Sequence, residues 1–339
     1  MNKETKLESS SQILHMIKDQ TTLLKGTAIF LILFDHIGEN IGWFPSLPLG
    51  AVGVYIFLFL SGYGLMRSAE TNGIAGYWRK RIKKVYVPYI AVLALCVVLS
   101  IICLHSVSEN FIKYLVLLKV PFGEYWYLRI QIIWYIAFFA IWMIKDRFKL
   151  SYKNWFVMII IADLIIVTTN VRVRNYAWTL GAFLWGGVIA VYGVQCLVRL
   201  KNWKIGVSIF LFTSIAAVCK KMPYVEHHEQ GFIDTALMLI IVLLIALFVV
   251  LYAEIILNYF KTIKKAVMKL GEFSYELYLA HSVFLDILRK ANLKGDGRLV
   301  ALLMFIVFTV ITAIALKFFV SWILSIKRLN RRESSIQNL

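Results

Sequence analysis

Residues 231–258 read GFIDTALMLIIVLLIALFVVLYAEIILN, and this stretch determines the class of fold. Its two acidic side chains, Asp234 and Glu254, stand towards opposite ends, and every residue between them is uncharged. A helix needs about 20 mainly apolar residues, each rising about 1.5 Å, to cross the hydrocarbon core of a bilayer. The stretch therefore predicts a transmembrane helix.

The composition of the whole chain supports the same conclusion. Its 339 residues are 60% hydrophobic and 17% charged, with a mean hydropathy of +0.74, whereas soluble domains average about 45–50% apolar and about 25% charged residues. Five prolines, 19 glycines and the lack of a repeat period exclude linker-rich chains and solenoids. The net charge of +18 comes from basic residues between apolar runs, so we expect topology signals and no nucleic-acid partner.

Nine other runs have the length and polarity of membrane spans, which predicts an all-α, polytopic transmembrane helix bundle. The ninth run in the chain is the weakest, because Glu276, His281 and Asp286 interrupt it. The ten expected spans cover residues 24–42, 49–66, 85–104, 126–144, 155–171, 176–195, 205–219, 231–258, 274–289 and 299–324.

The placement of Lys and Arg predicts the orientation of these spans. With the N-terminus in the cytoplasm, the cytoplasmic segments hold 25 basic residues and the external segments hold 10, while Arg129 and Lys317 fall inside spans. Cytoplasmic loops of membrane proteins carry such an excess. Without the ninth span the basic tail would lie outside. An even number of spans is therefore favoured, and we expect both termini in the cytoplasm.

The polar start of the chain predicts no cleavable signal peptide. We expect a cytoplasmic N-terminal segment over residues 1–22, a transmembrane domain over residues 23–325 and a basic cytoplasmic tail over residues 326–339. The loops are short, and no soluble domain is expected. Polar residues inside the spans are therefore the main evidence for function.

The first span, LLKGTAIFLILFDHIGENIGWF, places His36 deep in an apolar helix, eleven residues after Lys25. That spacing corresponds to about 16 Å along the helix axis. Glu39 follows at i+3 on the same face, whereas Asp35 is expected to point elsewhere. A histidine oriented by a carboxylate can act as a general base. The alternative is a hydrogen bond that only packs helices together.

The second span ends with Ser61, Gly62 and Tyr63, and Arg67 follows at its inner end. Small residues allow close approach of helices. A basic run then includes Arg79 and Arg81. This run has a simple explanation in positive-inside topology and attraction to anionic membrane lipids. It also suits a phosphorylated cytoplasmic ligand, because a guanidinium binds phosphate in a bidentate manner.

The fourth span opens with Trp126, Tyr127 and Arg129. An interfacial aromatic belt explains the first two residues. Arg129 would be costly facing lipid, so we expect it in the bundle interior or an outer cavity, where it can bind a polar acceptor. In the ninth span Tyr278 and His281 lie near one helical face and suggest a polar lining, although His281 also suits an interhelical contact.

Together these motifs resemble the acyltransferase-3 family of integral membrane acyltransferases. The family opens with a basic residue that ten other residues separate from a histidine. Lys25 and His36 match this motif. The match extends over most of the chain, and five motifs in order make it specific. The other four are the run from Phe57 and Phe59 to SGY at residues 61–63, RKRIKKVYVPY at residues 79–89, WYL at residues 126–128 and GEFSYELYLAH at residues 271–281.

The resemblance implies an enzyme that moves an acyl group, usually acetyl, from cytoplasmic acyl-CoA to a hydroxyl of a sugar or glycolipid on the outer side. A bacterial plasma or inner membrane and a cell-envelope role follow from it, and no metal is expected. His36 and Glu39 are the expected catalytic residues. Lys84 and Val87 depart from the family's frequent Arg and Pro. The remaining expected site residues are Lys25, Ser61, Arg67, Arg79, Arg81, Tyr278 and His281 for the donor acetyl-CoA, and Trp126, Tyr127 and Arg129 for the acceptor.

Two other classes of function compete with this interpretation. A transporter or flippase for a lipid-linked saccharide also needs many helices with interior polar residues. The two halves of the chain show no corresponding pair of spans interrupted by Gly or Pro, which counts against it. A sensor or assembly module without chemistry is disfavoured because both Lys25 and His36 are present.

Overall fold

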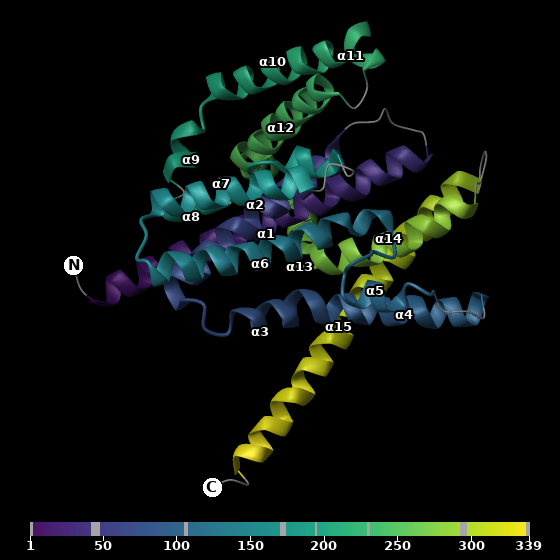
Figure 1. Ribbon diagram of the computed structural model, residues 1–339. Coiled ribbons are helices and arrows are strands. Elements are labelled where there is room, and N and C mark those ends of the chain that lie inside the picture. Colours follow the sequence, from purple (N-terminus) through teal and green to yellow (C-terminus); the bar gives the residue numbers. More distant parts are fainter. Residues whose placement is uncertain are drawn as a thin grey trace. The chain divides into compact units, whose positions relative to one another are not determined.

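The computed structural model describes residues 3–41, 48–104, 108–169, 174–193, 195–228, 231–291 and 297–336. Within these ranges the chain is all-α and has no strands (Figure 1). It forms two compact units, which are described separately. Unit 1 comprises Met1–Gly73 and Ile130–Glu272, and unit 2 comprises Ile74–Arg129 and Phe273–Leu339.

The helices of unit 1 are mostly long. They are α1 (Lys3–Ile41), α2 (Leu49–Asn72), α6 (Trp126–Arg147, from Ile130 onwards), α7 (Tyr152–Thr169), the 3₁₀ turn η3 (Arg174–Thr179), α8 (Ala182–Tyr192), α9 (Gln195–Leu200), α10 (Trp203–Lys220), α11 (Pro223–His227), α12 (Phe232–Tyr259) and α13 (Lys261–Glu272). The elements of unit 2 are α3 (Tyr77–Arg81), the π-helix η1 (Ile82–Tyr86), α4 (Val87–Leu104), α5 (Phe111–Leu115), the 3₁₀ turn η2 (Gly123–Tyr125), the start of α6, α14 (Ser274–Ala291) and α15 (Gly297–Ile336).

The described residues include seven helices that are long and apolar enough to cross a membrane, so the chain is a multi-pass membrane protein. They are Asp19–Glu39, Leu49–Asn72, Gly123–Arg147, Tyr152–Thr169, Trp203–Lys220, Phe232–Tyr259 and Leu299–Ser325.

Three of the ten expected runs are not among these seven helices. The runs at residues 85–104 and 274–289 lie on α4 and α14. The run at 176–195 is divided, because Gly181 adopts φ +80° between η3 and α8. The helix that follows has 11 residues, which rise only about 16 Å, roughly half of the hydrocarbon core.

Glycines hold the helices of unit 1 close together. A Cβ atom on Gly62 of α2 would lie 2.1 Å from the carbonyl oxygen of Phe183 on α8, and one on Gly186 would lie 1.9 Å from that of Phe59. A Cβ atom on Gly53 would lie 2.4 Å from the carbonyl oxygen of Ala28 on α1. Small residues at these crossings allow backbones to approach closely, as in other membrane helix pairs.

Tyrosine hydroxyls connect the elements of unit 2. Tyr89 on α4 donates to the carbonyl oxygen of Tyr114 on α5 at 2.7 Å. Tyr125 in η2 donates to the carbonyl oxygen of Leu279 on α14 at 2.5 Å. Each bond satisfies a phenol that would otherwise be buried without a partner. Stacking of Phe284 on α14 against a phenylalanine of α15, 5.7 Å between centroids, joins the last two helices.

Candidate active site

His36 lies in the C-terminal half of α1, and its ring faces Glu39 on the next turn of the helix. Its Nδ1 atom is 3.6 Å from Oε2 of Glu39, and the two side chains are 20% and 45% exposed. Ile29 and Ile32 on the same helix are buried, so packing of the apolar face fixes the rotation of α1 and leaves the His36–Glu39 pair at its edge. The distance is that of an ion pair, and it places a carboxylate beside the imidazole.

Asp35 joins this pair, which the sequence interpretation does not foresee. Its Oδ1 atom accepts a hydrogen bond from the backbone N–H of Leu49 at 3.2 Å, at the start of α2. One ligand-type atom from each of Asp35, His36 and Glu39 lies within 4.8 Å of the other two. This spacing fits the coordination of a cation. The expectation that Asp35 points away from His36 is therefore corrected.

Lys25 and Arg67 are the two basic residues of unit 1 that are expected to bind the donor, and both are exposed. Lys25 lies three turns before His36 on nearly the same face of α1, because eleven residues complete close to a whole number of turns of about 3.6 residues. Arg67 Nη1 is 3.6 Å from Oε2 of Glu70, and Tyr152 donates to the other oxygen of Glu70 at 3.1 Å. The guanidinium is thus held at the end of α2.

Ser61 has a defined partner inside unit 1. Its hydroxyl donates to Oε1 of Gln131 on α6 at 3.0 Å, and Gln131 is 3% exposed. This bond connects α2 to α6 in the middle of two candidate spans. Ser61 is half-buried, and its oxygen also retains lone pairs that can accept a hydrogen bond.

The expected phosphate-binding residues Arg79 and Arg81 lie in unit 2, on α3. Arg79 is exposed, whereas Arg81 is half-buried and its guanidinium lies 5.6 Å from the centroid of the Tyr77 ring. The basic run then continues into a π-helix, a rare conformation that is frequent at functional sites. Tyr275 on α14 donates to the carbonyl oxygen of Val85 in this π-helix at 2.8 Å.

Tyr278 and His281 are buried, with 2% and 0% exposure. Tyr278 donates to the carbonyl oxygen of Glu124. The His281 Nδ1 atom lies 2.6 Å from the carbonyl oxygen of Tyr278, so Nδ1 donates this bond. Tyr127 packs edge-on against Tyr278, 5.3 Å between centroids. This burial leaves no exposed atom on His281, and contact with the donor stays a prediction.

The same cluster contains an ion pair that the sequence interpretation misses. Glu124 is 7% exposed, and one of its carboxylate oxygens accepts a hydrogen bond from Arg289 Nη1 at 2.5 Å. The two residues are 165 positions apart, and no periodicity connects them. Trp126 and Arg129, the other expected acceptor-binding residues, are half-buried at the start of α6.

Within unit 1 the structure therefore brings together His36, Glu39 and Asp35, and it connects Ser61 to α6. Within unit 2 it brings Tyr127, Tyr278 and His281 together. These features define a multi-pass membrane protein with a histidine–carboxylate cluster inside a membrane helix.

A family model described as an acyltransferase domain matches residues 20–322. The chain belongs to the acyltransferase-3 family, which confirms the resemblance drawn from its motifs, and it is a membrane acyltransferase. No curated protein and no solved structure gives a significant match.

Proposed function

We propose that the protein is an O-acetyltransferase that moves acetyl from cytoplasmic acetyl-CoA to a hydroxyl of a cell-surface polysaccharide or glycolipid precursor, in a bacterial plasma or inner membrane. The observation that carries the proposal is the His36–Glu39 pair, 3.6 Å apart on a candidate membrane span within the segment that matches the family. Such a pair inside a membrane is expensive to keep unless it functions.

The reaction needs one base and one thioester. Glu39 faces Nδ1 of His36, which favours the tautomer with hydrogen on Nδ1 and leaves Nε2 unprotonated, so that it can act as a base. Nε2 takes the proton of the acceptor hydroxyl as its oxygen attacks the thioester carbonyl. The C–S bond breaks, the thiolate leaves and the imidazolium returns the proton to it. The products are an acetyl ester and coenzyme A.

The donor's phosphates require cationic partners. We assign Lys25 and Arg67 in unit 1, and Arg79 and Arg81 in unit 2, to this task, because guanidinium groups form bidentate contacts with phosphate. Ser61, Tyr278 and His281 remain proposed donor-site residues, and Trp126, Tyr127 and Arg129 remain proposed acceptor-site residues. For Tyr127, Tyr278 and His281, the hydrogen bonds and aromatic packing of unit 2 support a role in positioning neighbouring residues.

The topology belongs to the same proposal. We propose ten spans with both termini in the cytoplasm, residues 23–325 as the acyltransferase domain, residues 1–22 as a cytoplasmic segment and residues 326–339 as a basic tail. The 25 to 10 division of basic residues supports it, and the apolar helix α4, which has 18 residues, adds to the seven candidate spans.

An assay with purified full-length protein in liposomes tests the proposed activity. The liposomes receive labelled acetyl-CoA and polysaccharide or glycolipid precursors extracted from cells that lack the gene. An acetyltransferase places label on the precursor. A transporter or flippase for a lipid-linked saccharide instead moves the precursor across the membrane without acetyl-CoA and leaves it unlabelled. That result would contradict the proposal.

A further inference from the structure

Unit 1 contains an apolar cavity between α2, α8, α9 and α12. Its volume is about 380 Å³, within the range of about 300–1,000 Å³ typical of small-molecule sites. Tyr55, Trp185, Leu243, Ala246 and Leu247 are among its lining residues. The Trp185 side chain is half exposed. In a chain that spans a bilayer, an apolar cavity with such an opening is accessible to lipid.

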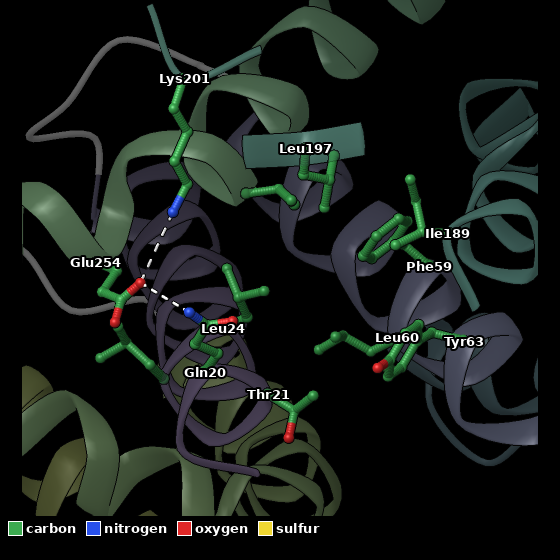
Figure 2. Close-up of a pocket in the computed structure, with 12 residues that line it drawn as sticks. Gln20, Thr21, Leu24, Phe59, Leu60, Tyr63, Ile189, Leu197, Lys201 and Glu254 are labelled. Carbon is green, nitrogen blue, oxygen red and sulfur yellow. Dashed lines mark hydrogen bonds and ion pairs between the residues drawn. The ribbon is translucent and has the colours of Figure 1, made fainter. Parts of the chain in front are cut away.

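A smaller pocket with a polar end adjoins this cavity. Phe59, Ile189, Leu197 and Val250 line both spaces. Figure 2 shows the smaller pocket, with Phe59 and Ile189 on one side and the Glu254 carboxylate on the other.

Glu254 Oε2 forms the centre of this polar end. It accepts a hydrogen bond from the Gln20 amide at 3.0 Å and lies 3.8 Å from the Lys201 ammonium. Both partners also line the smaller pocket. The combined space therefore has an apolar shaft and a charged, hydrogen-bonding mouth, which is the polarity of a lipid molecule.

The length of the combined space fits one leaflet of a bilayer. Leu243 lines its apolar part and Glu254 its polar end, and both lie on α12. Eleven residues separate them, which is about 16 Å at the rise of a helix. The hydrocarbon core is about 30 Å thick, so this distance is close to the depth of one leaflet.

The charge around the mouth indicates the headgroup. Arg199 and Lys204 flank Lys201 in the sequence, and both are exposed, so three cations accompany the single carboxylate of Glu254. Trp203, in the same segment, is 72% exposed, as expected of an indole at the membrane–water interface. Clustered cations at this level attract anionic lipid headgroups.

We propose that this space binds one anionic glycerophospholipid of the surrounding bilayer, with one acyl chain between α2, α8 and α12 and the phosphate at Lys201. The bound lipid is separate from the acyl-transfer reaction and neither donates nor accepts the acetyl group. Failure of the lipid test therefore leaves the proposed activity untouched, and the reverse also holds.

Native mass spectrometry of the full-length protein in detergent tests the proposal. The probes are phosphatidylglycerol and phosphatidylcholine with identical chains. Wild-type protein should retain one phosphatidylglycerol in preference to phosphatidylcholine. Ala246→Phe fills the apolar shaft and should abolish retention of this molecule, whereas Ile240→Phe, on an exposed part of α12, should retain it. Equal retention by wild type and Ala246→Phe would overturn the proposal, as would no retained lipid in wild type.

Two charge variants give effects of opposite sign. Lys201→Gln should lower the preference for phosphatidylglycerol about fivefold, because one interfacial cation is lost. Glu254→Gln should preserve or raise it, because a repelling carboxylate is removed. The same preference in both variants would contradict the placement of the phosphate.

A measurement on unmodified protein covers the case in which Ala246→Phe does not fold. Phosphatidylglycerol with a photoreactive group at the end of one chain should crosslink to Trp185, Leu243 or Leu247. Crosslinks confined to exposed α15 residues such as Phe318 would show only annular lipid and would overturn the proposal.

Discussion

His36 and Glu39 are placed by one helical turn of α1, so their distance of 3.6 Å depends on local geometry. Glu39→Gln keeps an oxygen near Nδ1 but removes the charge that stabilises an imidazolium. We expect a partial loss of the acyl-transfer rate, smaller than the roughly 10²–10⁴-fold that a general base contributes, at unchanged donor affinity. Initial rates at saturating acetyl-CoA measure it, and an unchanged rate would remove Glu39 from the mechanism.

The residue pattern allowed part of this site to be predicted. Helical periodicity alone relates Lys25, His36 and Glu39, because all three lie on one helix. The role of Asp35 depends instead on where the chain returns after α1, since its carboxylate accepts a hydrogen bond from Leu49. The spacing of residues within one helix does not show where the chain enters the next helix.

At the scale of elements, glycine contacts set the distance between α2 and α8. Gly62→Ala places a Cβ atom 2.1 Å from the carbonyl oxygen of Phe183, so the helices must separate, at a cost of about 1–3 kcal/mol. Thermal unfolding in detergent should show a lower melting temperature for this variant. Gly64→Ala is the matched control, because no atom of the described residues outside the local helix backbone lies within 4 Å of its Cβ position. Equal melting temperatures for the two variants would contradict the packing described.

The basic element α3 should bind the donor. Replacing Arg79 and Arg81 together by Gln should raise the KM for acetyl-CoA and leave kcat nearly unchanged, because phosphate contacts are lost and the chemistry is not. Added salt should raise the wild-type KM in the same direction. The control is Arg147→Gln with Lys153→Gln, two exposed cations of another loop. An equal KM in the two double variants would contradict donor binding by Arg79 and Arg81. Positive-inside topology would then explain these residues.

Most helices could be predicted from hydropathy, because seven of the expected runs coincide with long apolar helices. Two other features depend on tertiary contacts. The division of the run at 176–195 follows from the positive φ of Gly181, and the carboxylate of Asp163 accepts a hydrogen bond from the N–H of that glycine at 2.6 Å. The π-helix at Ile82–Tyr86 is stabilised by a distant tyrosine, Tyr275. Neither contact leaves a periodic signal in the sequence.

At the scale of the whole molecule, the proposed topology can be measured directly. A reporter fused after Leu339 should be cytoplasmic, since ten spans return the chain to the side on which it begins. A second reporter in the loop around residue 222 should be external. An external location for the C-terminal reporter would contradict the ten-span topology, and the run at 274–289 would then be the first to discard.

Acyl transfer by the full-length His36→Ala variant in liposomes tests the proposed mechanism most directly. We expect the rate to fall by about 10²–10⁴-fold, because a general base contributes that much, while binding of acetyl-CoA persists. The control, His227→Ala on the exposed end of α11, should transfer acetyl at the wild-type rate. Transfer at the wild-type rate by His36→Ala would contradict the role of His36 as the general base.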